Sequence, residues 1–287
     1  MIKAVLLGTG AGKADANRFS PSNIVWVDGE PVVIDVGSGS LLRMRQAGIY
    51  PGEVRTVFLT HLHYDHYSDY PYLVIEPLIG EAAFSRGKLT VYGPPGTERL
   101  VRHFERAYDV EYDAYASLPG YDRSRELSRS NVVEFYDGWA VQLGSLRVTA
   151  RKVDHGVVEI PSFGFRFEDE DGRALVFSGD TVPCDGILEL ARGADILVYE
   201  CTLPQSEVEL RKQRGYAWYI HSTPRHAGQV AREASVGKLV LNHFAAWNSF
   251  EPDRPVYDWH AIAPPVIAEE FDGSVLVGED LMRIDVD

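Results

Sequence analysis

Residues 60–66 (Thr-His-Leu-His-Tyr-Asp-His) constrain this chain of 287 residues more than any other stretch. They follow an apolar run that predicts a buried strand, so they lie on the loop that leaves its carboxyl end. Strand alternation directs His61 and His63 to the same side, whereas Asp65 and His66 follow on a turn. Zinc favours imidazole and carboxylate ligands, and short histidine-rich tracts are typical of metal sites. The segment therefore predicts a metal site that needs further ligands from elsewhere in the fold.

Three more residues of ligand type follow strand-like patterns. These are His155, Asp180 and His243, which come after residues 146–153, 174–179 and 238–241. Open α/β sheets bind ligands at the carboxyl ends of their strands. We therefore expect four separate strand ends to deliver histidine and aspartate side chains to one edge of the fold.

This series of residues resembles the metallo-β-lactamase superfamily of dinuclear hydrolases. The His-x-His-x-Asp-His pattern at 61–66 is typical of its hydrolase branches. Further motifs are similar to one branch, the tRNA 3′-processing endoribonuclease ribonuclease Z. They lie at residues 7–12, 18–20, 34–39, 91–96, 199–202 (Tyr-Glu-Cys-Thr) and 221–223 (His-Ser-Thr). The likeness runs from about residue 5 to about residue 245.

The resemblance implies an α/β fold, a four-layer αββα sandwich, in which ligands from both halves meet along one edge. It also implies two divalent metal ions. Histidine and carboxylate ligands suit zinc, manganese and iron, and zinc is favoured. The implied ligands of the first metal are His61, His63 and His155. Those of the second are Asp65, His66 and His243, and Asp180 bridges the two.

The implied mechanism uses these metals to make a nucleophile. Two cations about 3.5–4 Å apart can hold one hydroxide between them and clamp the oxygens of an ester. Asp65 can orient that hydroxide. The family's general acid corresponds to His221, oriented by the glutamate that matches Glu200, and a carboxylate partner raises the pKa of a histidine. The alternative for His221 is a structural loop histidine that bonds to backbone.

Two other carboxylate and glycine signals need an interpretation. Asp35 resembles the carboxylate that fixes a ligand histidine in this family, and a turn-forming aspartate is the alternative. The glycine-rich residues 8–12 match neither the Rossmann nor the Walker pattern. We interpret them as a tight turn that lets the backbone pass close to the metal edge.

The chain departs from the ribonuclease Z branch in two ways. The long tRNA-gripping arm of that branch lies between the positions of His155 and Asp180, which here are only 25 residues apart. The chain is also acidic, since 28 Lys+Arg against 42 Asp+Glu give a net charge of −14. Nucleic-acid binding normally needs a basic stripe, and the densest basic stretch, residues 211–214, lies among glutamates. These features favour a small-molecule substrate over a nucleic acid.

The predicted function is therefore metal-dependent hydrolysis of a small-molecule ester. A phosphodiester is favoured because poor leaving groups gain most from a general acid. The alternatives are tRNA 3′-processing, an aryl sulfatase, lactonase or phosphotriesterase activity, and metal-dependent ligand binding without turnover. The seven filled ligand positions favour an enzyme, and a di-iron redox protein would usually carry a flavin domain for which the chain has no room. Aromatic residues within 215–220 and 245–258 are expected to wall an apolar pocket.

Length and composition predict one domain over residues 1–287, with a charged, tyrosine-rich surface excursion near 109–130. No apolar run approaches the ~20 residues of a membrane span, and the N-terminus begins as a strand without a leader. The two cysteines give no disulfide framework. We therefore expect a cytoplasmic protein without a membrane partner, and the resembling branch suggests a homodimer.

The hydrophobic patterns predict alternating strands and helices. We expect strands at about 2–7, 23–27, 31–36, 55–60, 88–92, 132–135, 139–143, 146–153, 163–167, 173–178 and 195–200. We expect helices at about 39–47, 95–107 and 185–192, and another that starts after Thr223, a plausible N-cap followed by Pro224.

Overall fold

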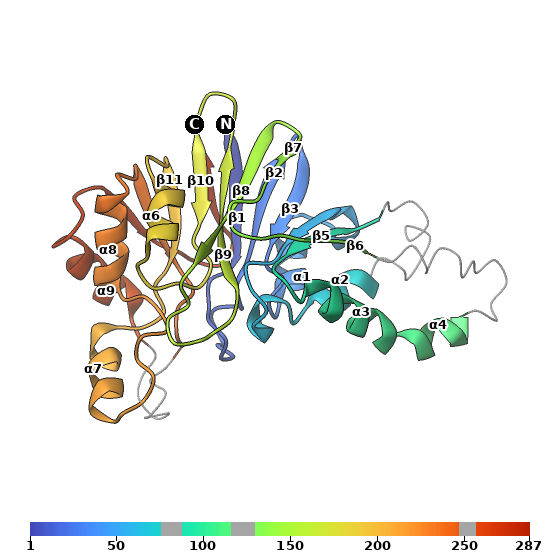
Figure 1. Ribbon diagram of the computed structural model, residues 1–287, viewed down its shortest axis with the longest axis horizontal. Helices are drawn as coiled ribbons and strands as arrows, with labels where there is room; N and C mark the ends of the chain where they lie inside the picture. The colour runs from blue at the N-terminus through green and yellow to red at the C-terminus, as the bar shows by residue number, and fades with distance from the viewer. Residues whose placement is uncertain (76–87, 116–129, 247–256) are drawn as a thin grey trace.

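Two seven-stranded sheets lie face to face in the computed structural model, which describes residues 1–75, 88–115, 130–246 and 257–287. Their strand orders are β14-β1-β2-β3-β4-β5-β6 and β13-β12-β11-β10-β9-β8-β7. Helices cover the two outer faces (Figure 1). The fold is therefore the αββα sandwich expected from the sequence.

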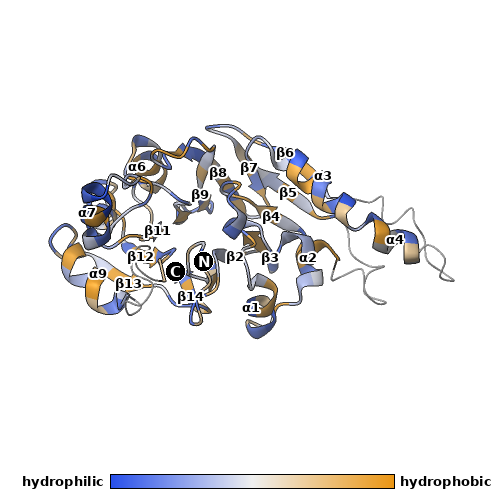
Figure 2. Cartoon of the chain, turned by 90° about the horizontal axis from the view of Figure 1, so that it is seen from below, coloured by the Kyte–Doolittle hydropathy of each residue, from blue (hydrophilic) through white to orange (hydrophobic). Residues whose placement is uncertain are grey.

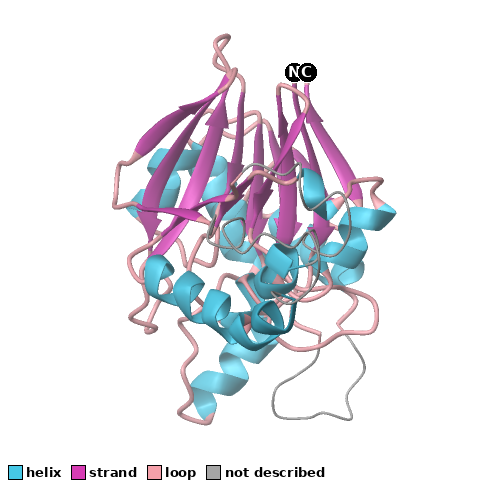
Figure 3. Ribbon diagram, turned by 90° about the vertical axis from the view of Figure 1, so that its right-hand side faces the viewer, coloured by secondary structure: helices cyan, strands magenta, loops and turns pink. Residues whose placement is uncertain are grey.

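Each sheet combines antiparallel strands with a run of parallel strands. The two parallel runs end at the same edge of the sandwich. The strands of the first sheet are β1 (Ile2–Gly8), β2 (Ser22–Val27), β3 (Glu30–Ile34), β4 (Thr56–Phe58), β5 (Thr90–Gly93), β6 (Asn131–Glu134) and β14 (Met282–Val286). Those of the second sheet are β7 (Ala140–Leu143), β8 (Leu146–Val153), β9 (Ser162–Glu168), β10 (Ala174–Phe177), β11 (Ile196–Glu200), β12 (Lys238–Asn242) and β13 (Ser274–Val277). Strand β14 pairs with β1, so the two chain ends lie side by side (Figure 3).

The helices divide between the two outer faces. On the side of the first sheet lie α1 (Ser40–Gln46), α2 (Tyr70–Ile75), α3 (Thr97–Ala107) and α4 (Asp109–Tyr115), with the short 3-10 turns η1 (Pro51–Glu53) and η2 (Tyr64–His66). On the other side lie α6 (Asp185–Ala191), α7 (Gln205–Gln213), α8 (Pro224–Glu233) and α9 (Trp259–Ile267). In the described part of the chain, no helix is both long and apolar enough to cross a bilayer.

The layer between the sheets is filled by alternate residues of facing strands. On β2, for example, Val25 and Val27 point into this layer, whereas Ile24 points to the helices. Phenylalanines form its centre: the ring centroid of Phe165 lies 5.2 Å from that of Phe58 and 5.6 Å from that of Phe135. This core holds the two sheets in a fixed relation and so fixes the edge at which their loops meet.

Most predicted elements are confirmed to within a few residues. The helix after Thr223 begins at Pro224, and the Thr223 hydroxyl accepts a hydrogen bond from the His226 amide. The predicted surface excursion at 109–130 starts as helix α4, and its residues 116–129 lie outside the described part. The sequence analysis did not predict α2, α7, α9, β13 or β14.

Two of the missed helices, α7 and α9, lack an amphipathic signal. Figure 2 shows α7 mostly hydrophilic and α9 mostly hydrophobic, so neither has the two-sided pattern that identifies a helix. Helix α9 also contains Pro264 and Pro265, which normally break helices. Its start is fixed by Asp258, whose side chain accepts a hydrogen bond from the Ala261 amide.

The aromatic centre of the core can be tested by substitution. Phe165→Ala should lower the free energy of unfolding by about 3–5 kcal/mol, because it opens a cavity among fully buried rings. The measurement is denaturant unfolding followed by circular dichroism. Tyr136→Ala is the matched control, since that ring is 67% exposed and its loss should change the value by less than about 0.5 kcal/mol. Equal effects of the two substitutions would contradict the assigned core.

Candidate metal centre

The loops that follow the strands of both sheets bring seven ligand-type side chains together. From the first sheet, His61, His63, Asp65 and His66 leave β4 and turn through η2. From the second sheet, His155 follows β8, Asp180 follows β10 and His243 follows β12. All except His63 are buried. The structure thus places every residue of the predicted ligand set at one edge.

Four of these side chains form the first group. His63 Nδ1 lies 3.0 Å from His61 Nε2 and 3.3 Å from His155 Nε2. Asp180 Oδ2 lies 3.7 Å from both of those Nε2 atoms. The four ligand atoms lie within 4.8 Å of one another, a spacing that one metal ion can bridge.

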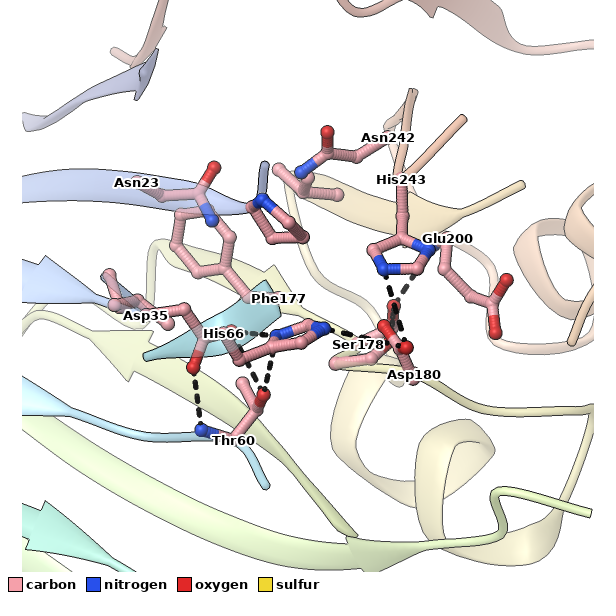
Figure 4. A pocket seen from close by; sticks show the side chains of 14 residues that line it. Asn23, Asp35, Thr60, His66, Phe177, Ser178, Asp180, Glu200, Asn242 and His243 are labelled. Atoms are coloured by element: carbon pink, nitrogen blue, oxygen red, sulfur yellow. Dashed lines mark hydrogen bonds and ion pairs between the residues drawn. The ribbon is translucent and has the colours of Figure 1, made fainter. Parts of the chain in front are cut away.

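The second group contains Asp65, His66 and His243. Asp65 Oδ2 lies 3.6 Å from His66 Nε2 and 3.4 Å from His243 Nε2. Asp180 Oδ2 lies 3.5 Å and 3.3 Å from the same two nitrogens (Figure 4). One oxygen of Asp180 therefore lies between the two groups, as expected for a bridging carboxylate.

The donor set fits metal ions, because two of its nitrogens have no other partner. His66 Nε2 and His243 Nε2 are buried and make no hydrogen bond to the protein. Buried polar atoms are nearly always paired. These two nitrogens point toward the same pair of carboxylates, and a cation there would satisfy all of them.

The pKa values of the ligand-type residues in the metal-free protein agree with this interpretation. Burial lowers the pKa of His61 well below its ordinary value, and burial also lowers the pKa of His155, so both imidazoles offer a lone pair. Burial would raise the pKa of Asp65, but His66 and His243 lower it to about 2. Burial would lower the pKa of His66, but the carboxylates around it raise it well above its ordinary value. A metal ion would replace that proton among the carboxylates.

On the first sheet, a carboxylate and a hydroxyl support the ligands from behind. Asp35 Oδ2 lies 2.8 Å from His66 Nδ1, and the Thr60 hydroxyl donates to the same oxygen at 2.9 Å. Thr60 Oγ1 also lies 3.1 Å from His61 Nδ1. Asp35 has a left-handed backbone, with φ of 61°. It is therefore both a turn residue and the partner of a ligand histidine, which joins the two interpretations made from the sequence.

The second sheet repeats this arrangement with different residues. Thr202 Oγ1 donates to Glu200 Oε2 at 2.7 Å and lies 2.7 Å from His243 Nδ1. Because a hydroxyl has only one hydrogen, His243 Nδ1 must be the donor to Thr202. The lone pair of His243 is therefore on Nε2, which faces the cluster.

The glycine-rich turn holds the backbone around His243, which has a left-handed φ of 61°. The Phe244 amide donates to Thr9 O at 2.8 Å, and the Ala11 amide donates to Phe244 O at 2.9 Å. A side chain at Gly12 would lie 3.1 Å from Asp65 Oδ2. The turn therefore passes close to the ligands, as the sequence analysis expected.

His221 lies beside the cluster on a loop of the second half. Its Nδ1 is 3.0 Å from Glu200 Oε1 and 3.9 Å from Asp180 Oδ2. Burial would lower the pKa of His221, but the Glu200 charge and hydrogen bond outweigh it, so the pKa is raised. Glu200 is itself fixed, because the amides of Thr181 and Ser222 donate to its two oxygens. The structure thus pairs His221 with a carboxylate rather than with backbone.

The remaining histidines lie away from the cluster. His103 bonds to Arg99 O on α3, and His226 belongs to the start of α8. His260 pairs with Glu279 at 3.1 Å and is exposed.

The expected aromatic wall is only partly described. Within the predicted ranges, Tyr216 and Trp218 are exposed. Phe244 and Trp259, which border the second range, lie in the core, with ring centroids 5.0 Å apart. The predicted wall residues Trp247 and Phe250 lie outside the described part of the chain.

Known proteins are similar to this chain in sequence and in fold. A family described as "Beta-lactamase superfamily domain" matches residues 32–244. A protein named Ribonuclease Z from Mycolicibacterium gilvum is 33% identical over 291 residues, which cover all of this chain and 96% of that protein. A protein of the same name from Mycobacterium tuberculosis is 32% identical and covered to 98%. The 291 aligned positions exceed the 287 residues of this chain by only four, so the alignment with the first relative contains no long insertion relative to this chain.

Solved structures agree on the fold. The metallo-β-lactamase fold protein YhfI from Bacillus subtilis has a TM-score of 0.76 and 17% identity, over 99% of this chain and all of that one. Human tRNase Z, short form, has a TM-score of 0.70 and 22% identity, over 99% of each chain. A diphosphatase from the PhnP family has a TM-score of 0.66 and 18% identity, over all of this chain and 98% of that one.

The support of His243 by Thr202 predicts a selective effect on metal binding. Thr202→Val should lower the affinity for a divalent ion about 10–100-fold, because the imidazole loses the acceptor that orients it. Thr202→Ser keeps the hydroxyl and should bind like the original protein. Equilibrium dialysis with metal analysis measures both. Thr149→Val, on β8, is the control, and an unchanged affinity of the Thr202→Val protein would refute the role of the hydroxyl.

Proposed function

This chain belongs to the β-lactamase superfamily, in its ribonuclease Z-like branch, and from that premise we propose that it is a metal-dependent hydrolase that cleaves phosphodiesters of small molecules. The observation that carries the proposal is the His221–Glu200 pair beside the seven ligand-type residues. A proton donor next to such a cluster serves reactions that expel a poor leaving group.

We assign the ligands of two divalent ions to the two groups that meet at Asp180. One ion is held by His61, His63 and His155, the other by Asp65, His66 and His243, with Asp180 shared. Zinc is the favoured metal for these ligands, and manganese and iron also suit them. When bound, such ions activate water near neutral pH and neutralise charge on phosphoryl oxygens.

Asp65 takes the role of orienting the attacking water. Its pKa of about 2 keeps the carboxylate ionised, so that it accepts a hydrogen bond from water at neutral pH. A Cβ added at Gly12 would lie 3.1 Å from its Oδ2 oxygen, so the backbone of the glycine turn passes close to this carboxylate. The carboxylate thus acts by position and by its charge.

His221 supplies the proton to the departing oxygen. Glu200 holds Nδ1 at 3.0 Å, which leaves Nε2 as the nitrogen that can donate. The Glu200 carboxylate favours the protonated imidazole of His221, as the raised pKa of His221 indicates. Glu200 therefore acts on the reaction through the orientation and charge of His221.

The net charge of −14 supports a small substrate, because the net negative charge repels a polyanion. tRNA 3′-processing is the second candidate, and it is favoured by relatives named Ribonuclease Z that match this chain over its full length. The short connection between His155 and Asp180 does not separate the candidates, because a relative named Ribonuclease Z aligns with the whole of this chain over only 291 residues.

A hydrolysis panel tests the proposed function. The protein, loaded separately with zinc and manganese, should cleave bis(p-nitrophenyl) phosphate, and Asp180→Ala should abolish this activity because both ligand groups lose their shared oxygen. The panel also holds p-nitrophenyl sulfate, an acyl lactone, a phosphotriester and a precursor tRNA. Preferred cleavage of the precursor tRNA would establish the second candidate. No turnover despite bound metal would refute both and leave a binding role.

The role of His221 predicts a dependence on the leaving group. His221→Ala should slow hydrolysis of an alkyl phosphodiester about 10²–10⁴-fold, the usual contribution of a general acid. It should slow a p-nitrophenyl diester far less, because p-nitrophenolate departs without a proton. Steady-state kcat for the two substrates gives the comparison, with His103→Ala as the control on an exposed helix. Equal losses on both substrates would show that His221 does not protonate the leaving group.

A further inference from the structure

A carboxylate outside the seven ligand-type residues, Asp280, joins three segments that are distant in the sequence. It lies in the turn between β13 and β14, and its side chain is 5% exposed. Its Oδ1 atom accepts hydrogen bonds from the amide of Thr9 at 2.9 Å and from the hydroxyl of Thr9 at 2.8 Å. Its Oδ2 atom accepts a hydrogen bond from the Phe19 amide at 2.8 Å and pairs with Arg43 at 3.0 Å. Both oxygens are therefore engaged, and none of these partners is a ligand-type residue of the cluster.

Thr9 connects this carboxylate to the backbone beside a ligand. It is fully buried, and its carbonyl oxygen accepts the hydrogen bond from the amide of Phe244, which directly follows His243. His243 has the left-handed φ of 61°. For a residue other than glycine such a conformation costs free energy and persists only where the surrounding structure holds it. The contact from Thr9 lies directly next to this strained ligand position.

Arg18 holds the side chain of the same neighbour. Its guanidinium carbon lies 4.5 Å from the ring centroid of Phe244. Its Nη1 atom donates to the Thr9 hydroxyl at 2.6 Å and to Gly278 O at 2.6 Å. The Thr9 hydroxyl therefore accepts from Arg18 and gives its single hydrogen to Asp280. This series of bonds holds both the backbone and the ring of Phe244.

We propose that Asp280, acting through Thr9 and Arg18, is a positioning residue for His243 and thus for the second group of ligands. The inference rests on the metal assignment made in the proposed function. None of the contacts described above reaches His61, His63 or His155, so the effect should be selective for the second ion.

All three positioning side chains lie outside residues 32–244, the range that the superfamily domain matches. Thr9 and Arg18 precede this range and Asp280 follows it. The two ends of the chain are brought together by the pairing of β1 with β14. The pairing of the chain ends therefore has a consequence for the metal centre in addition to closing the first sheet.

Cobalt(II) titration of the metal-free protein tests this inference, because bound cobalt absorbs visible light and histidine and carboxylate ligands suit it. The original protein should take up two equivalents. Asp280→Ala should raise the dissociation constant of the second group about 10–100-fold, the usual effect of losing an outer support of a ligand, and leave the other step within about twofold. His243→Ala identifies which step belongs to the second group, because it removes the ligand itself.

A pair of substitutions at Thr9 isolates the hydroxyl. Thr9→Val removes it and should show the same selective loss of cobalt affinity as Asp280→Ala. Thr9→Ser keeps the hydroxyl and should bind both equivalents like the original protein. The Thr9 pair also decides the matter if Asp280→Ala does not fold.

Ile284→Ala is the control for a general loss of stability, since this buried residue of β14 belongs to the core between the sheets. It should lower Tm and leave both cobalt steps unchanged. An equal loss in both steps for Asp280→Ala, or the same selective shift for Ile284→Ala, would show that Asp280 serves only stability. Two equivalents without any selective loss would refute the inference alone. Fewer than two equivalents in the original protein would refute the metal assignment and the inference with it.

Discussion

The charge of one buried carboxylate, Asp180, organises the edge where the two sheets meet. Four imidazole nitrogens lie within 3.3–3.7 Å of its Oδ2 atom. Burying such a charge is expensive unless it is paired. His66 and His243 reach it from opposite sheets, and His243 does so from a left-handed backbone position at a strand end. The packing of the two sheets therefore serves to hold cationic or metal-bound partners around a group that neither sheet could bury alone.

Each sheet supports a ligand imidazole with a buried carboxylate and a threonine, although the two sheets connect these groups differently. On the first sheet Asp35 contacts His66 directly and Thr60 assists, so the support is rigid. On the second sheet Thr202 stands between Glu200 and His243, which leaves the other Glu200 oxygen for His221. The difference matters, because only the second carboxylate contacts both the threonine that supports a ligand and a further histidine, His221.

The strand patterns predicted an α/β fold and the gathering of the ligand-type residues at the carboxyl ends of strands, whereas the αββα sandwich was implied by the family resemblance. The sequence did not predict the supporting role of Thr60 and Thr202, whose hydroxyls need the folded loops to find their partners. Helix α9 was missed because its apolar residues surround it and prolines interrupt it.

The size of the substrate depends on the protein surface around this edge, and the ligand-type residues themselves do not restrict it. In the proposed reaction the same ligand geometry suits any phosphodiester, since bound metal ions would act on the phosphoryl group and His221 on the departing oxygen. Affinity for a long RNA needs many phosphate contacts, and each contact needs a cation on the surface. With 42 acidic against 28 basic residues, this chain could offer such contacts only where its basic residues gather. The argument for a small substrate therefore depends on the distribution of surface charge, which the reaction centre itself does not determine.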